Sequence, residues 1–314
     1  MNTTEYEQAA DQYLAALPSM KKSQNTIRMY RHILNRYADF LRNEQNRGTT
    51  PLSVVGWRVS LFDEDLSANS VRYYMTVLHG FFEWAVRMHM CPENPVDTAE
   101  IPEQKDVAYN LLTLDEIKQL FQQQPHGLNT KTMPRNRAII FLLLQAGMRN
   151  SELRNLRLCD LNFEQNTITI RHGKGDKRRE IAFPQLAQSA VKAYLASGTR
   201  PAWVDDTAPL FGSDADRNGH STGGTEWHPL SSAALLGIVN RYVESCTGHK
   251  GIKVHALRHA AASLWDDMGI PMRTIQTVLG HASIRTTEQI YVKILDKSKA
   301  AQKVNQAFDK AEFA

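Results

Sequence analysis

The residues best suited to chemistry lie near the C-terminal end of the sequence. His255, Arg258 and His281 can all donate hydrogen bonds, and the arginine carries a fixed positive charge. Such a donor cluster suits an anionic, oxygen-rich centre such as a phosphodiester. Tyr291 is the only tyrosine after Tyr242. A lone tyrosine beside such a cluster suits a nucleophile that forms a covalent bond.

Five short motifs follow one another along the chain. They are Gly147-Met148-Arg149, Gly173-Lys174-Gly175, His255-Ala256-Leu257-Arg258, Leu279-Gly280-His281 and finally Tyr291. This order resembles that of the tyrosine recombinases, the phage integrase and Xer-like family. Each motif alone is nonspecific, whereas five in the right order are a specific signal. The resemblance covers nearly the whole chain, because the first hundred residues are similar to the family's DNA-clamping domain.

The resemblance implies a catalytic set that attacks a DNA phosphate. Tyr291 is expected to be the nucleophile and to form a 3′-phosphotyrosine, which preserves the energy of the broken bond. Arg149 and Arg258 are expected to neutralise the phosphate, because a guanidinium binds two oxygens and stays charged. Lys174 is expected to protonate the leaving 5′ oxygen.

The remaining members of the predicted site support these groups. His255 and His281 are expected to hydrogen-bond the phosphate or to tune Tyr291. Glu152, three residues after Arg149, is expected to orient the site. One departure concerns spacing: the tyrosine stands ten residues after His281, whereas the family usually has nine. The longer interval affects how Tyr291 is presented and leaves its identity as the nucleophile unchanged, since no other tyrosine follows.

A metal site is the alternative interpretation of the histidines. His255 and His259 are four residues apart, as on zinc-binding helices, but the intervening residues lack the metalloprotease glutamate. Arg258 between them also disfavours a cation. No Walker-type phosphate loop occurs. We therefore expect no metal and no cofactor.

Composition places the chain among soluble globular proteins. Its 314 residues allow two domains. No apolar run approaches the length of a membrane helix, and the first residues do not resemble a signal peptide. Three widely spaced cysteines argue for a reducing cytoplasm. The small positive excess falls in residues 106–314.

Periodicity predicts a mainly α-helical protein with a small β-hairpin, and the resemblance implies that it is organised as a two-domain DNA clamp. Residues 1–98 form the expected helical, SAM-like core-binding domain, with helices over 3–17, 25–46, 54–62 and 70–89. Residues 99–110 are the expected linker, and 111–314 the catalytic domain. In that domain we expect a buried helix ending near 145, strands at 167–171 and 179–183, a long loop over 198–229, and helices from 231 onward.

Basic residues outside the catalytic set are candidates for phosphate contacts. The second predicted helix carries arginines on its polar face, where the family places a DNA-facing helix; a solvated surface is the alternative. The predicted DNA-binding residues are Lys22, Arg28, Arg31, Lys177, Arg178 and Lys253.

The resemblance implies a site-specific recombinase or integrase of a bacterium or mobile element, acting on double-stranded DNA as a dimer on one site and a tetramer in the synapse. Residues 297–314 are expected to form a helix that docks on a neighbouring protomer; packing on its own domain is the alternative. Relaxation of DNA by a type IB topoisomerase, which uses similar chemistry, and DNA binding without catalysis are the alternatives.

Overall fold

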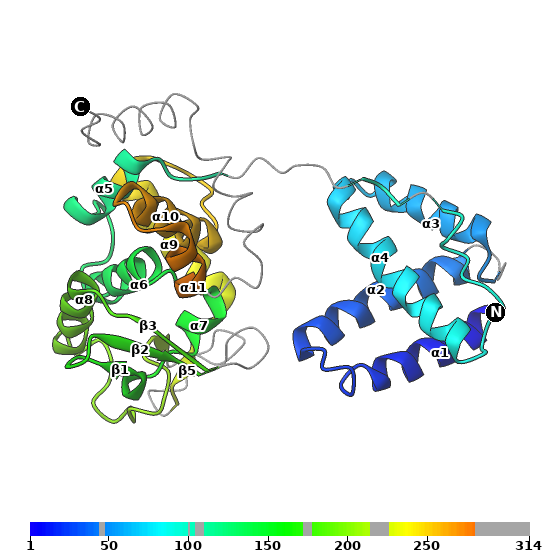
Figure 1. Ribbon diagram of the computed structural model, residues 1–314, viewed down its shortest axis with the longest axis horizontal. Coiled ribbons are helices and arrows are strands. Elements are labelled where there is room, and N and C mark those ends of the chain that lie inside the picture. Colours follow the sequence, from blue (N-terminus) through cyan, green and yellow to red (C-terminus); the bar gives the residue numbers. More distant parts are fainter. Residues whose placement is uncertain (44–47, 100, 104–109, 172–177, 214–225, 280–314) are drawn as a thin grey trace, which may run out of the picture. The chain divides into compact units, whose positions relative to one another are not determined.

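The computed structural model describes residues 1–43, 48–99, 101–103, 110–171, 178–213 and 226–279. The chain divides into two compact units, Met1–Ala108 and Tyr109–Ala314 (Figure 1). Both are mainly helical, which confirms the predicted fold class. Each unit is described separately below.

The described part of the first unit contains four helices, α1 (Thr3–Ala16), α2 (Gln24–Asn43), α3 (Pro51–Asp63) and α4 (Ala68–Arg87). Side-chain caps fix several of their starts. Asn2 and Thr50 each form a reciprocal capping box with the residue three positions later. Pro51 lies at the first position of α3, where its missing N–H costs nothing. The third helix is therefore longer than the sequence predicted.

Aromatic side chains fill the core of the first unit. The ring of Tyr6 lies edge-on to those of Tyr37 and Phe81, each at 5.2 Å between centroids. Tyr37 also packs on Trp57 at 4.9 Å. The buried hydroxyl of Tyr6 donates to the carbonyl of Leu34 at 3.1 Å, which satisfies its polar atom. These contacts tie all four helices into one core.

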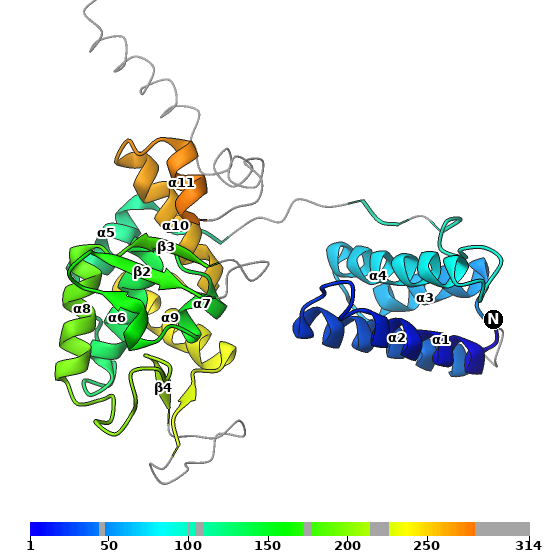
Figure 2. The same ribbon diagram turned by 60° about the horizontal axis from the view of Figure 1, so that its bottom comes forward.

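In the second unit, helices surround a buried central helix and a small sheet lies to one side (Figure 2). The helices are α5 (Leu114–Gln122), α6 (Met133–Gln145), α7 (Asn150–Arg154), α8 (Gln185–Ala196), α9 (Ser232–Thr247), α10 (Val254–Asp267) and α11 (Met272–Leu279). Helix α6 is the predicted apolar run, and its residues from Ala138 to Leu144 are all buried. It is therefore the axis of this core.

The sheet is antiparallel, with β2 (Thr167–Ile170) between β1 (Leu161–Asn162) and β3 (Arg179–Ala182). Ile168 pairs with Ile181, and Ile170 pairs with Arg179. Ile168 and Ile170 face the core, as the alternation predicted. The β2–β3 pairing confirms the two predicted strands.

The segment expected to be a long loop is partly structured, which corrects that prediction. Val204, Leu210 and Phe211 are buried in the described part. A short pair of strands, β4 (Gly212–Ser213) and β5 (His228–Pro229), closes it. The indole N–H of Trp227 donates to the carbonyl of Pro209 at 2.8 Å. The many turn-forming residues of this segment interrupt any regular spacing of apolar residues, so the sequence did not reveal these few buried positions.

Candidate active site

The backbone at the end of α6 brings Arg149 to the start of α7. Gly147 adopts φ of +59°, in the left-handed region that ends many helices. A side chain there would meet the terminal methyl of Leu279 at 2.7 Å and the ring of Trp265 at 3.0 Å. Met148 is buried and anchors the turn. Arg149 then takes the extended conformation directly before α7.

Glu152 on α7 binds Arg149 through side chain and backbone. Its Oε1 accepts from Nη1 of Arg149 at 2.7 Å, and its Oε2 accepts from the Arg149 backbone N–H at 2.9 Å. Glu152 is 1% exposed in its side chain. Burial alone would raise the pKa of Glu152, but hydrogen bonds from Arg179 and Arg149 hold that pKa below its usual value. The carboxylate therefore stays ionised and fixes the Arg149 guanidinium.

Arg258 lies on α10 and is 1% exposed. Its Nη1 donates to the carbonyl of Gly147 and its Nη2 to the carbonyl of Leu279. These carbonyls stand at the C-terminal ends of α6 and α11, where helices leave acceptors without an internal partner. Arg258 thus joins three helices while remaining beside Arg149.

Positive charge is concentrated around Arg258. Burial, followed by the neighbouring charge of Arg149, lowers the pKa of Arg258 to about 9, with Arg179 acting in the same direction. The guanidinium still carries its charge at neutral pH. Within the described residues, the Nε atoms of Arg258 and Arg179 are buried and meet no acceptor. Three guanidinium groups around one carboxylate leave an excess of positive charge, an environment suited to an anion.

His255 lies one turn before Arg258 on α10, and its ring packs against that of His259. The two rings meet edge to face at 4.5 Å between centroids, and His259 is buried. Partial burial lowers the pKa of His255, and the charges of Arg258 and Arg149 lower it further. The ring is therefore mostly neutral at pH 7 and can both donate and accept a hydrogen bond.

The structure brings together Arg149, His255 and Arg258 of the predicted catalytic set, with Glu152 beside them. Lys174, His281 and Tyr291 lie outside the described residues, as do Lys177 and the helix expected over 297–314. The sequence interpretation missed Arg179, which appeared only as the first residue of a strand. Its position immediately after the basic hairpin was the available signal.

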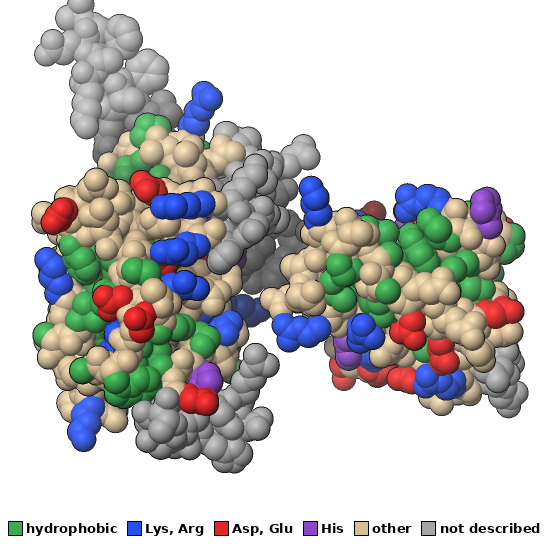
Figure 3. All heavy atoms as spheres, turned by 90° about the horizontal axis from the view of Figure 1, so that it is seen from below, with side chains coloured by type: hydrophobic (Ala, Val, Ile, Leu, Met, Phe, Trp, Pro, Cys, Tyr) green, Lys and Arg blue, Asp and Glu red, His purple; other side chains and the backbone are tan. Residues whose placement is uncertain are grey.

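The predicted DNA-binding residues in the described ranges are exposed: Lys22, Arg28 and Arg31 in the first unit, and Arg178 and Lys253 in the second. Other arginines of α2 behave differently, because Arg36 pairs with Glu64, and Arg42 pairs with Glu7 and Asp39. On the face drawn in Figure 3, several Lys and Arg side chains of the second unit lie in a row.

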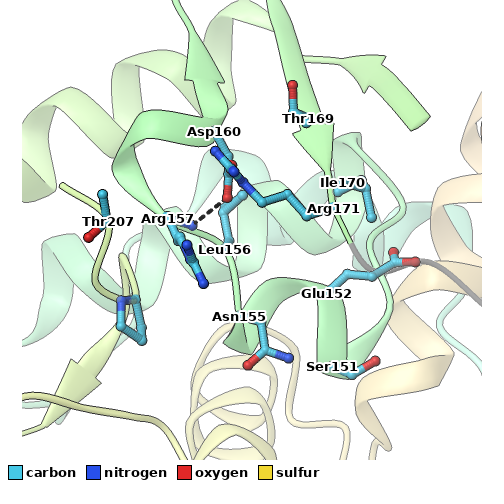
Figure 4. A pocket seen from close by; sticks show the side chains of 11 residues that line it. Ser151, Glu152, Asn155, Leu156, Arg157, Asp160, Thr169, Ile170, Arg171 and Thr207 are labelled. Carbon is cyan, nitrogen blue, oxygen red and sulfur yellow. Dashed lines mark hydrogen bonds and ion pairs between the residues drawn. The ribbon is translucent and has the colours of Figure 1, made fainter. Parts of the chain in front are cut away.

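A cavity of about 290 Å³ lies between α7 and β2, and Glu152 contributes to its wall (Figure 4). On its other side Asp160 accepts from the backbone N–H of Arg157 at 3.1 Å and pairs with Arg171. Asp160 is 3% exposed in its side chain. The cavity thus separates two buried carboxylates: Glu152 holds Arg179 of β3, and Asp160 holds Arg171, which directly follows β2.

Among the residues that the structure places, no three His, Cys, Asp or Glu side chains gather as metal ligands would. Within those same ranges, no helix is both long and apolar enough to cross a membrane.

Comparison with protein families gives two matches that together span most of the chain. Residues 110–298 match the phage integrase family, and residues 10–89 match the phage integrase N-terminal SAM-like domain. Tyrosine recombinase XerA of Pyrococcus furiosus is 32% identical over 295 residues, covering 90% of this chain and 89% of the relative. Tyrosine recombinase XerC of Oceanobacillus iheyensis is 30% identical, covering 86% and 85%.

Solved structures share the fold. The Tn1549 transposon integrase in complex with transposon right end DNA superposes with a TM-score of 0.68 at 18% identity, covering 98% of this chain and 99% of that one. XerH recombinase bound to a palindromic difH substrate gives 0.67 at 21% identity, covering 89% and 79%. With family matches in both units and a relative of this identity over nearly its full length, the chain belongs to the phage integrase family of tyrosine recombinases.

Proposed function

We propose that this protein cuts and rejoins double-stranded DNA at specific sites through a covalent 3′-phosphotyrosine. The observation that carries the proposal is the grouping of Arg149, Arg258 and Arg179 around the single carboxylate of Glu152, with His255 adjacent. Such a site binds an anion whose oxygens gain negative charge during reaction. Membership of the recombinase family supports DNA as that anion.

The chemical step transfers a phosphoryl group between two oxygens. Tyr291 gives its phenol proton to solvent, its oxygen bonds to phosphorus, and the bond from phosphorus to the 5′ oxygen breaks. Lys174 gives a proton to that 5′ oxygen. Arg149 and Arg258 neutralise the non-bridging oxygens, and the positive site favours loss of the tyrosine proton, whose reference pKa is about 10. Reversal with a different 5′ hydroxyl rejoins the strand.

The test of covalency uses Tyr291→Phe, which removes only the nucleophilic oxygen. A nicked suicide substrate traps the protein–DNA adduct, which is seen on a denaturing gel. We expect the adduct with the wild type and its absence with the variant, while DNA binding persists. An adduct that persists in the variant would place the nucleophile elsewhere.

We further propose a division of labour along the chain. Residues 1–98 act as the core-binding domain, 99–110 as linker and 111–314 as the catalytic domain, and both domains grip one DNA site. Exposed Lys22, Arg28 and Arg31 on one domain, and Arg178 and Lys253 on the other, supply phosphate contacts. Lys177 completes this set. The work takes place on DNA in the cytoplasm.

The active assembly is proposed to be a tetramer that joins two DNA sites, each held by a dimer. Apolar residues recur through 297–314 at helical spacing, and docking on a neighbour would bury them. Removal of the residues after Lys297 should then leave single-site binding intact and reduce tetramer formation. Recombination by the truncated protein at the wild-type rate would refute the docking.

A further inference from the structure

Arg179 forms a two-bond ion pair at the described site, although no motif in the sequence assigned it a role. It is the first residue of β3, and its Nη1 and Nη2 donate to Oε1 and Oε2 of Glu152 at 2.9 and 3.0 Å. This is the parallel two-bond geometry that a guanidinium makes with a carboxylate. The pair is largely shielded from water, with 19% exposure on Arg179 and 1% on Glu152.

The same two oxygens of Glu152 also hold Arg149. Each oxygen therefore accepts two hydrogen bonds, one from Arg179 and one from Arg149. The carboxylate cannot rotate without breaking bonds to both arginines. The orientation of Arg149 consequently depends on a side chain that belongs to the sheet, 27 residues away from Glu152 in the sequence.

We propose that Arg179 is a positioning residue for cleavage, which fixes Glu152 and through it aims Arg149 at the scissile phosphate. The inference rests on the proposed function. Both terminal nitrogens of Arg179 are occupied by Glu152, so the residue acts through the carboxylate. Register supports the same role, because Arg179 pairs with Ile170 at the last described step of the β2–β3 ladder. The sheet thereby supplies a rigid base for the arginine.

A substitution test is possible because the chain contains a matched control. Arg171 follows β2 and pairs with buried Asp160 on the other side of the cavity (Figure 4). Arg179→Gln removes the charge and the fork on Glu152, and Arg179→Lys keeps the charge but loses the fork. Arg171→Gln removes a similar pair that does not touch Glu152. Thermal melting of each variant separates loss of folding from loss of function.

The decisive comparison uses two nicked substrates that differ at the scissile phosphate. One carries the natural phosphodiester, and the other a methylphosphonate, in which a methyl group replaces a charged oxygen. A misplaced Arg149 matters most when that charge must be neutralised. We expect Arg179→Gln to slow adduct formation on the phosphodiester about a hundredfold, as displacement of a catalytic group by about 1 Å can. On the methylphosphonate the loss should shrink to a few fold.

Several outcomes would overturn the inference. An equal loss on both substrates would mean that Arg179 supports the fold or the leaving group, and no loss on either would mean that it positions nothing. Where Arg179→Gln melts too early to assay, Arg179→Lys decides by the same comparison. Cleavage at the wild-type rate by that lysine variant would show that the fork is dispensable.

A double variant tests the route through the carboxylate. If Arg179 acts through Glu152, then Glu152→Gln combined with Arg179→Gln should cleave no more slowly than Glu152→Gln alone. Losses that multiply would make the two residues independent. Failure of the proposed function is distinguishable, because it would appear as absence of any adduct with the wild-type protein, whereas failure of this inference leaves the wild-type adduct intact.

Discussion

Gly147→Ala should lower the free energy of unfolding, because the turn before Arg149 has no room for a side chain. An added methyl group would stand 2.7 Å from Leu279 and 3.0 Å from Trp265, and the backbone there has φ of +59°. The left-handed conformation costs an alanine about 1–2 kcal/mol relative to glycine. Overpacking against a filled core adds about 1–3 kcal/mol. Together these terms predict a loss of about 2–5 kcal/mol in the free energy of unfolding.

Gly198→Ala is the matched control. Gly198 has φ of +68°, and an added methyl group there would have no neighbouring atom within 4 Å. This variant carries the backbone term alone, so it should lose only about 1–2 kcal/mol. The difference between the two variants measures the contact with Leu279 and Trp265. Urea titration of both full-length proteins, followed by circular dichroism, gives both numbers from transitions of the same unit.

Strand cleavage by the same two variants gives a second test of this prediction. The carbonyl of Gly147 accepts from Arg258, so a shifted turn should displace that guanidinium as well as Arg149. We expect Gly147→Ala to lose adduct formation under conditions in which both variants remain folded, while Gly198→Ala retains it. Equal destabilisation and equal cleavage in the two variants would refute the packing argument, since only strain common to both would then remain.

Three further predictions follow from charge. EDTA should leave strand cleavage intact, because arginines handle the phosphate charge; loss of cleavage that a divalent ion restores would contradict this. Arg31→Gln should weaken binding to all DNA sequences and reduce the slope of log affinity against log salt by about one. Arg42→Gln removes an arginine already paired with acids and should leave that slope unchanged. Equal slopes for the two variants would show that this face of α2 is only a solvated surface. The lowered pKa of His255 means that the unfolded chain takes up a proton first as pH falls below 6.5, so acidification through that range should destabilise the wild type more than His255→Asn in urea titrations.

Much of the fold could be predicted, because local patterns determine it. The helical spacing of apolar residues located α1, α2 and α4, and the alternation at 167–171 located β2. A continuous apolar run identified α6. Contacts distant in sequence were harder to foresee. Helix α8 carries buried Ala187, Val191 and Tyr194; Pro184 before it and Gly198 after it were available boundary signals, but we did not predict it.

In the site, too, the local motifs could be predicted from the sequence and the contacts distant in sequence could not. Motif order pointed to Arg149 and Arg258, whose catalytic roles stay predictions. The spacing of residues in the sequence does not predict which carboxylate each guanidinium binds. Arg179 meets Glu152 only because β3 folds back beside α7. Arg36 pairs with Glu64 at the end of α3, and Arg42 pairs with Glu7 of α1 and with Asp39 one turn earlier on α2. The arginines of α2 therefore differ in their pairing, and only the packing of the helices shows which are paired and which remain exposed.

The two carbonyls that Arg258 holds have an evolutionary consequence. A substitution at this position removes an active-site cation and, at the same moment, leaves two helix ends inside the protein without a donor. An unsatisfied buried acceptor costs about 1–3 kcal/mol, and losses of that size change the cellular abundance of a protein several-fold. Selection therefore acts on Arg258 through protein quantity as well as through turnover. A lineage that abandoned catalysis but kept DNA binding would still be under pressure to retain this arginine, so its presence in a relative is weak evidence that the relative is active.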